Sequence, residues 1–273
     1  MTVAGTLVCD AVSWSVADRT ILQPMSWQLS AGQRLGIIGP NGAGKSSLLK
    51  LLAGLMAPTT GAVWFENQPI LSMANNARAQ QIAFLSQDNH ITSQASVWQL
   101  VALGRLPHQK WYQSIADVDC ELIAAALAHT NLSERALSPL TELSGGELQR
   151  AHLARVLVQQ AKVLLLDEPT NHLDVQHQHQ LLALTRRSHH GGPTGQSLFN
   201  QPMTLIASFH DLNVAASYCD QLLLLHQGQL IAMASPAEVL TSEVLEQVYQ
   251  RRCIVDTNPF DGRPRVTFAP ERQ

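Results

Sequence analysis

Short runs of mostly apolar residues recur along the chain, and their length and spacing predict buried β-strands. Each run spans four or five residues and lacks the strict alternation of a half-exposed strand. Segments with helical periodicity lie between the runs. The runs are Leu35–Ile38, Ile82–Leu85, Val163–Leu166, Thr204–Ser208 and Gln221–Leu225. The sequence therefore predicts an α/β fold in which helices cover both faces of a mostly parallel sheet.

The strand–helix alternation stops between about Ser93 and Glu142, where polar turns separate helical patterns. Leu122–Leu127 is the clearest helical run in this part. We expect a single domain over 1–273, with an α/β core in 1–87 and 160–273 and an inserted helical subdomain in 88–159. Ser188–Pro202 is rich in Gly, Ser, Gln and Pro, which predicts a surface loop.

Composition narrows the class of protein. A formal charge of −3 gives no excess of Lys and Arg for binding nucleic acid or an anionic membrane. No apolar stretch approaches the roughly 18 residues of a membrane helix, and the N-terminus lacks a signal-peptide pattern, so we expect a cytosolic protein. The four cysteines are far apart, which predicts reduced, mostly buried thiols. Five histidines fall between His172 and His190, but no cysteine or carboxylate cluster completes a metal site there.

A glycine-rich loop after the first predicted core strand has the pattern of a nucleotide-phosphate cradle. Small residues let backbone N–H groups approach phosphate oxygens. Lys45 would neutralise the β- and γ-phosphates, and the Ser46 hydroxyl would ligate Mg²⁺. The alternative, a glycine-rich turn that binds nothing, does not explain Lys45 and Ser46 at the start of a helical run. The residues expected to bind ATP are Gly39, Pro40, Asn41, Gly42, Ala43, Gly44, Lys45, Ser46 and Ser47.

Two carboxylates follow the apolar run Val163–Leu166. The carboxyl edge of a doubly wound sheet is where ligands bind, and we expect the phosphate loop at that same edge. Strand alternation would point the two side chains in different directions. We assign Asp167 to the Mg²⁺ shell and Glu168 to the attacking water. The alternative is a pair of solvated carboxylates at a strand end.

A second candidate for an anion-binding helix start lies at Leu143–Glu147, ahead of the helical stretch Leu148–Gln159. Ser144, Gly145 and Gly146 have the composition of such a start. This short pattern is weak evidence alone, and one triphosphate has no obvious need of two helix starts from one chain.

The motifs taken together resemble the ATP-binding cassette subunits of ABC transporters, over nearly the whole chain. The resemblance implies that two cassettes dimerise head to tail, so that Ser144 and Gly146 of one chain close over ATP held by the other. The matching motifs are Gly39–Ser46, Gln87 after a strand, Leu143–Glu147, Val163–Glu168, Asp174, and His210 after a strand.

The same resemblance implies roles for three further residues. Gln87 would touch the metal and the attacking water, Asp174 would span the dimer seam, and His210 would hydrogen-bond the γ-phosphate. Taken alone, His210 has the alternative of a structural histidine. The family's adenine-stacking aromatic is commonly found near Val16, and the nearest aromatic here is Trp14.

Four segments are similar to cassettes that power uptake of ferric siderophores, heme and cobalamin, and the first and last are most similar to hydroxamate-siderophore importers. The implied partners are a second cassette, two transmembrane permease subunits and, indirectly, a periplasmic or lipid-anchored substrate-binding protein. The implied location is the cytoplasmic face of the inner membrane, and Gly104–Trp111 is the candidate docking segment. The segments are Ser13–Leu22, Val101–His108, Leu173–Gln178 and Cys253–Pro259.

Two alternatives belong to other functional classes. The segment Glu168–Asp174 has a sequence that is frequent in ribosome-associated cassette ATPases, but those proteins usually carry two cassettes and an excess of basic residues. A DNA-repair clamp would need long coiled-coil heptads in the helical insert, and the sequence has none.

Overall fold

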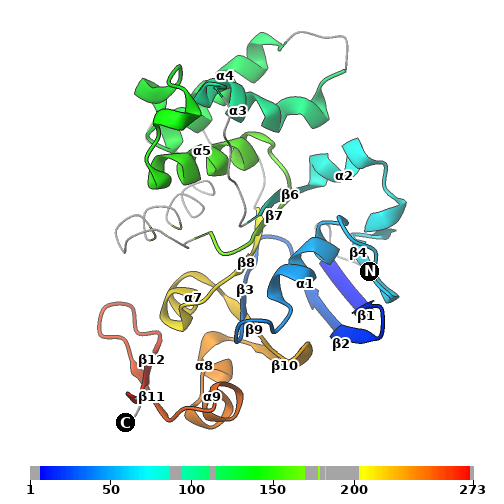
Figure 1. Cartoon of the computed structure of the whole chain (residues 1–273), viewed down its shortest axis with the longest axis vertical. Coiled ribbons are helices and arrows are strands. Elements are labelled where there is room, and N and C mark those ends of the chain that lie inside the picture. The colour runs from blue at the N-terminus through cyan, green and yellow to red at the C-terminus, as the bar shows by residue number, and fades with distance from the viewer. Residues whose placement is uncertain are drawn as a thin grey trace. The chain divides into compact units, whose positions relative to one another are not determined.

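The computed structural model describes residues 7–86, 94–110, 115–169, 178, 182 and 203–270 of the chain. These residues form two compact units, one from Met1–Ser72 with Thr204–Gln273 and the other from Met73–Met203 (Figure 1). Gln87, Trp111, Asp174, the expected loop 188–202 and, apart from residues 178 and 182, the histidine-rich stretch 172–190 lie outside the described residues.

The first unit begins with an antiparallel sheet. Its strands are β1 (Leu7–Val16), β2 (Arg19–Leu29), β4 (Thr60–Phe65) and β5 (Gln68–Pro69), in the order β2-β1-β4-β5. Along β2, buried Met25, Trp27 and Leu29 alternate with exposed polar residues, which is the pattern of a strand with one solvent-facing side. The continuous apolar runs did not predict this sheet.

The central part of the first unit is a parallel arrangement around β3 (Arg34–Ile38). Strands β8 (Thr204–Ser208) and β9 (Gln221–His226) pair with β3 on either side, and β10 (Gln229–Ala234) adds to β9 antiparallel. β8 is buried throughout and β9 along its four leucines, as expected of strands covered on both faces. Helices α1 (Lys45–Leu52) and α7 (Leu212–Tyr218) follow β3 and β8.

The C-terminal part of this unit contains the helices α8 (Pro236–Val239) and α9 (Ser242–Tyr249), followed by the hairpin of β11 (Cys253–Thr257) and β12 (Pro264–Phe268). The rings of Tyr249 and Phe268 lie 5.5 Å apart, which ties the hairpin to α9. The short helix η1 (Ile70–Ser72) closes the N-terminal part of the unit.

The second unit pairs two parallel strands, β6 (Ile82–Leu85) and β7 (Val163–Leu166), and is otherwise helical where it is described. Gly104 lets η2 (Leu103–His108) lie against α5 (Gly145–Val158), because a Cβ there would come within 2.1 Å of the Arg155 carbonyl oxygen. The helices are α2 (Asn75–Gln81), α3 (Val97–Ala102), η2 (Leu103–His108), α4 (Asp117–His129), η3 (Ser133–Arg135), η4 (Leu140–Glu142) and α5 (Gly145–Val158).

The predicted α/β class and all five predicted strands are confirmed, with shifts of one residue at the ends of β3 and β9. None of the described cysteines forms a disulfide, and Cys9, Cys219 and Cys253 are buried. In the described ranges, every helix falls short of the length and apolarity needed to cross a bilayer. The proposed limits of the helical subdomain, 88–159, stay a prediction, since β6 and β7 group with the helices in the second unit.

Candidate functional site

The phosphate loop connects β3 to α1 and is shaped by close backbone packing. Gly39 has φ +145°, and a Cβ there would lie 2.1 Å from the carbonyl oxygen of Leu225 in β9. Gly44, the residue before α1, has φ +102°, and its missing Cβ leaves room for the Leu22 side chain. Both positions therefore require glycine, for backbone conformation and for space. The start of α1 points its first N–H groups at whatever the loop encloses.

Lys45 lies inside this loop rather than on the surface. Its side chain is 5% exposed, and Nζ donates hydrogen bonds to the Gly39 carbonyl at 2.8 Å and to the Pro40 carbonyl at 3.2 Å. A buried ammonium needs such acceptors. The loop thus holds one positive charge next to a helix N-terminus, an arrangement that suits a polyphosphate.

His210 follows the strand beside the one that leads into the loop. β3 and β8 run parallel with Ile37 opposite Ser208, and the Phe209 amide donates to the Ile37 carbonyl at 3.0 Å. The carboxyl ends of both strands therefore share one sheet edge, which brings exposed His210 to the same edge as the loop. The next residue, Asp211, caps α7 by accepting from the amides of Asn213 and Val214.

Trp14 is linked to the loop through one intervening side chain. It stands opposite Leu22 in the β1–β2 pairing, so the two side chains lie on the same face of the sheet. Leu22 is buried and packs where a Gly44 Cβ would be. The half-buried indole of Trp14 is thus on the loop side of β1.

Tyr249 is a contact of the loop that the sequence patterns did not reveal. Burial raises the pKa of its hydroxyl to about 12, and a hydrogen bond from the Gly39 backbone offsets part of that rise. The contact joins the end of α9 to the first residue of the loop. No local motif marks Tyr249, because the contact spans more than 200 residues of sequence.

The two carboxylates at the end of β7 belong to the second unit and are buried, Asp167 to 3% exposure and Glu168 to 9%. The Asp167 amide donates to the Leu85 carbonyl at 2.8 Å, which extends the β6–β7 pairing by one residue. β7 ends at Leu166, and Glu168 has a left-handed φ of +49°. The expected alternation of a strand therefore does not apply to Glu168; its direction is set by this turn, a conformation concentrated at functional sites.

Ser144 starts α5 and forms a reciprocal cap with Glu147. The Glu147 amide donates to the Ser144 Oγ at 3.3 Å, and Glu147 Oε2 accepts from the Ser144 amide at 2.9 Å and from its hydroxyl at 2.8 Å. These bonds lower the pKa of Glu147, the backbone one first. Glu147 Oε1 lies 3.5 Å from Nε of Arg135. Gly145 and Gly146 form the first turn of α5, as the sequence predicts.

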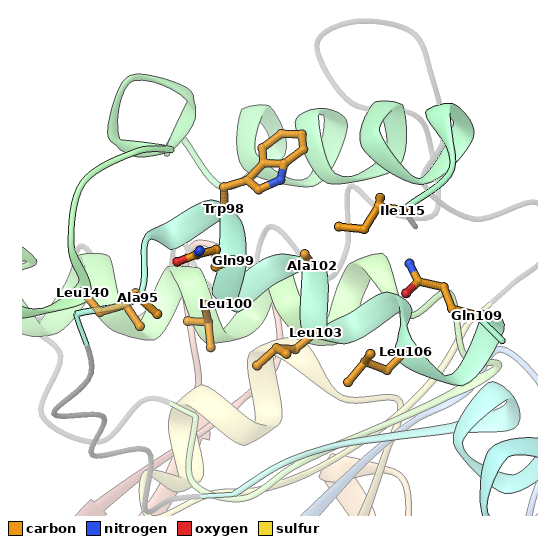
Figure 2. Close-up of a pocket in the computed structure, with 10 residues that line it drawn as sticks. All are labelled: Ala95, Trp98, Gln99, Leu100, Ala102, Leu103, Leu106, Gln109, Ile115 and Leu140. Atoms are coloured by element: carbon orange, nitrogen blue, oxygen red, sulfur yellow. The ribbon is translucent and has the colours of Figure 1, made fainter. Parts of the chain in front are cut away.

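A groove of about 650 Å³ opens on the helical part of the second unit (Figure 2). Leu103, Leu106 and Ile115 are its exposed apolar side chains, 39–56% accessible. The lining residues are Ala95, Trp98, Gln99, Leu100, Ala102, Leu103, Leu106, Gln109, Ile115 and Leu140.

Arg105 cannot serve as a surface contact of the docking segment 104–111. Its side chain is buried, and Nε lies 2.7 Å from Asp119 Oδ1 in α4. Nη1 of Arg105 also donates to the Val158 carbonyl at the end of α5. Arg105 therefore stabilises the packing of the helices around it. Reversing its charge would destabilise the fold and would not test docking to the permease.

Three expected arrangements stay predictions. Gln87 and Asp174 lie outside the described ranges. The phosphate loop and the pair Asp167 and Glu168 belong to different units, so their meeting at one site stays a prediction. Among the described residues, no cluster of three or more His, Cys, Asp or Glu is arranged to hold a metal by itself.

Known proteins resemble this chain along most of its length. A family model described as ABC transporter matches residues 22–171. The ferric enterobactin transport ATP-binding protein FepC of Escherichia coli is 36% identical over 90% of this chain and 88% of its own. The hemin import ATP-binding protein HmuV of Pseudomonas aeruginosa is 39% identical over 91% and 94%.

The cobalamin import ATP-binding protein BtuD of Halobacterium salinarum is 36% identical over 98% of this chain, which spans 62% of that relative's length. Among solved structures, a chain of an inward-facing ABC transporter described as a metal-chelate type superposes with a TM-score of 0.81, at 26% identity over 98% of both chains. CbiO1 of Clostridium perfringens, part of the ABC transporter complex cbiONQ, gives 0.73 at 26% identity over 89% and 94%.

Proposed function

This chain belongs to the ABC transporter family, and from that premise we propose that it is the ATP-hydrolysing subunit of an importer for a ferric siderophore, heme or cobalamin. The observation that carries the proposal is the loop Gly39–Ser46, in which close backbone packing and the enclosed Lys45 ammonium form an anion cradle at the start of α1. The relatives named for enterobactin, hemin and cobalamin support import as the task.

In the proposed site, the first unit binds the nucleotide. Backbone amides of the loop and the Lys45 ammonium hold the phosphates, and the half-buried Trp14 supports the adenine. His210 hydrogen-bonds the γ-phosphate from the neighbouring strand end. Mg²⁺, when bound, neutralises β- and γ-phosphate charge, and the hydroxyl of Ser46 and carboxylate of Asp167, with Gln87, have the hard oxygen donors it prefers.

Glu168 orients the attacking water and accepts its proton. The site is completed by a second copy of the chain, whose Ser144 and Gly146 close over the γ-phosphate while Asp174 spans the seam. ATP binding draws the two cassettes together and hydrolysis releases them, so that the nucleotide shifts a conformational equilibrium of the assembly.

The remaining partners are two permease subunits, and we assign the groove around Leu103, Leu106 and Ile115 to them. Its apolar lining and its place after the Gln87 segment support this assignment. The protein would then act at the cytoplasmic face of the membrane, with a substrate-binding protein engaging the permease from the other side and no nucleic acid involved.

Within this import class we propose a hydroxamate siderophore as the cargo. Overall sequence identity does not separate the cargoes, because the relatives named for enterobactin, hemin and cobalamin are similarly identical to this chain. The support therefore comes from the segments Ser13–Leu22 and Cys253–Pro259. The test is to reconstitute the chain with its co-purifying permease and to measure ATPase stimulation by binding protein loaded with ferric hydroxamate, heme or cobalamin. Stimulation by ferric hydroxamate alone is expected. Stimulation by another ligand corrects the cargo, and co-purification with ribosomes instead of a permease contradicts import.

A further inference from the structure

The hydroxyl of Ser144 is already engaged inside its own chain. It lies 2.8 Å from Glu147 Oε2, which also accepts from the Ser144 amide at 2.9 Å. An ionised carboxylate can only accept hydrogen bonds, so the Ser144 hydroxyl is the donor of this pair. The pKa of Glu147 is lowered by these same bonds, and the residue carries its charge at neutral pH.

This engagement conflicts with the role that the proposed function gives to Ser144. A hydroxyl has one proton, and a γ-phosphate oxygen also requires a donor. Ser144 therefore cannot donate to Glu147 and to the other chain's ATP at the same time. A carboxylate at the helix start also repels an incoming phosphate, because both are negative.

The structure provides a second position for the carboxylate. Arg135 in η3 places Nε 3.5 Å from Glu147 Oε1, and its side chain is half exposed while that of Glu147 is 21% exposed. Arg150, one turn along α5, adds positive charge on the same side. A rotation of the Glu147 side chain can therefore exchange the Ser144 hydroxyl for a closer pairing with Arg135, a charge-assisted bond.

We propose that Glu147 is a positioning residue that opposes closure of the cassette dimer: it holds the Ser144 hydroxyl until the other chain's ATP displaces it, and Arg135 then receives the displaced carboxylate. This inference rests on the proposed function, which supplies the second chain and its nucleotide. It goes beyond that function by assigning Glu147 and Arg135 control over the ATP concentration at which two chains close.

The experiment measures ATP-dependent dimerisation of the full chain in a Glu168→Gln background, where hydrolysis does not consume the complex. Light scattering on a size-exclusion column gives the ATP concentration at half-maximal dimer. Glu147→Gln keeps a capping acceptor at the same position but removes the charge. We expect the half-maximal ATP concentration to fall by about tenfold.

The matched control is Glu238→Gln. Glu238 forms the same reciprocal box with Ser235, accepting from its amide at 3.0 Å and its hydroxyl at 2.6 Å. Because that box starts a short helix elsewhere in the chain, its neutralisation should leave the half-maximal concentration unchanged. A purely structural role of Glu147 would give the same result for both variants.

Arg135→Gln tests the second position and leaves the cap of α5 intact. We expect it to raise the half-maximal ATP concentration about threefold alone and to have no effect in the Glu147→Gln chain, since no carboxylate then needs a receiver. An undiminished effect in the double variant overturns the role of Arg135.

The outcomes separate this inference from the function it rests on. Dimerisation of the parent chain with an unchanged or raised ATP requirement in Glu147→Gln overturns the control by Glu147 and leaves the proposed function standing. A parent chain that stays monomeric at every ATP concentration overturns both, because no nucleotide then reaches Ser144.

Discussion

Two helices of this chain begin with features suited to an anion, and they are prepared for it in opposite ways. α1 starts after Gly44, which has no side chain, and its first turn contains Lys45 and no acid. α5 starts after Ser144, whose hydroxyl and amide are both bound by Glu147 in the first turn. The first start presents positive charge and has no side-chain cap, while the second is capped and negatively charged.

The difference indicates which half of the site is complete in a single chain. Close packing of Gly39 and Gly44 fixes the backbone of the phosphate loop before any ligand arrives, so binding requires little backbone rearrangement. The start of α5 has to give up its internal hydrogen bonds before it can accept a phosphate. A single chain is therefore expected to bind ATP, whereas closing a second chain over it is the regulated step.

The largest expected effect is that of removing the Lys45 charge from the start of α1, which we call the prepared start. Lys45→Ala takes away the only ammonium held inside the described loop, and ATP binding and hydrolysis should both fall by roughly 100-fold or more. Equilibrium binding of a fluorescent ATP analogue checks this. Lys50→Ala, at the exposed end of the same helix, is the matched control, and normal turnover by Lys45→Ala would refute the assignment of the loop.

Glu168→Gln separates binding from hydrolysis, so that the two helix starts can be compared without turnover. Loss of the proton acceptor should slow hydrolysis by about 10²–10⁴-fold while ATP stays bound and closed dimer accumulates. A single-turnover assay and size-exclusion chromatography check the two parts. Exposed Glu243 in α9 offers the control Glu243→Gln; a rate equal to the parent's would show that another group activates the water.

Ser144→Ala removes the cap at the start of α5, which we call the self-capped start because Glu147 of the same chain completes it. It should cost about 1 kcal/mol of stability through loss of the cap and lower ATPase activity by at least about tenfold, with ATP affinity of the single chain unchanged. Thermal melting and ATP titration check both. Ser235→Ala removes the same kind of cap from α8 and should keep full ATPase activity; an equal loss there would reduce Ser144 to a structural role.

The next prediction concerns the groove on the second unit, which also contains the start of α5. It tests whether this groove binds the permease. Leu106→Asp puts a charge on an apolar side chain that is 56% exposed in the groove and should weaken permease association by about tenfold. Leu137→Asp, 85% exposed in the same unit outside the groove lining, should have little effect. Pull-down of the permease distinguishes them, and equal losses would argue against the groove.

The smallest expected effect concerns the hydrogen bond by which Tyr249 holds the phosphate loop. Tyr249→Phe keeps the ring beside Phe268 but removes the hydroxyl that bonds the Gly39 backbone. A lost neutral hydrogen bond of about 1 kcal/mol, shared between folding and binding, should raise the KM for ATP about twofold with kcat unchanged. A change in kcat alone would contradict a role in fixing the loop.

The sequence predicted elements whose signal is local. β6, β7 and β8 follow from runs of apolar residues because both of their faces are covered, and the phosphate loop follows from the spacing of glycines before Lys45. The sheet of β1, β2, β4 and β5 was missed because its strands are half exposed and contain polar residues, although the alternation Met25–Leu29 marks one of them.

Contacts between distant residues could not be predicted in the same way. Arg105 lies in the segment expected to dock the permease, and its burial could not be predicted because its partner Asp119 comes from another helix. The contact of Tyr249 with Gly39 joins opposite ends of the chain. Glu147 could be recognised as half of a capping box from its spacing to Ser144, but its second neighbour, Arg135, comes from η3, which η4 separates from α5 in the sequence.

In the proposed dimer, each ATP is held between the start of α1 in one chain and the start of α5 in another. Mixing Lys45→Ala with Ser144→Ala chains, both in the Glu168→Gln background, tests it most directly, since one composite site of each mixed dimer keeps both Lys45 and Ser144. We expect ATP-dependent dimers in the mixture and monomers in each variant alone, measured by light scattering. A mixture that stays monomeric at saturating ATP would contradict it.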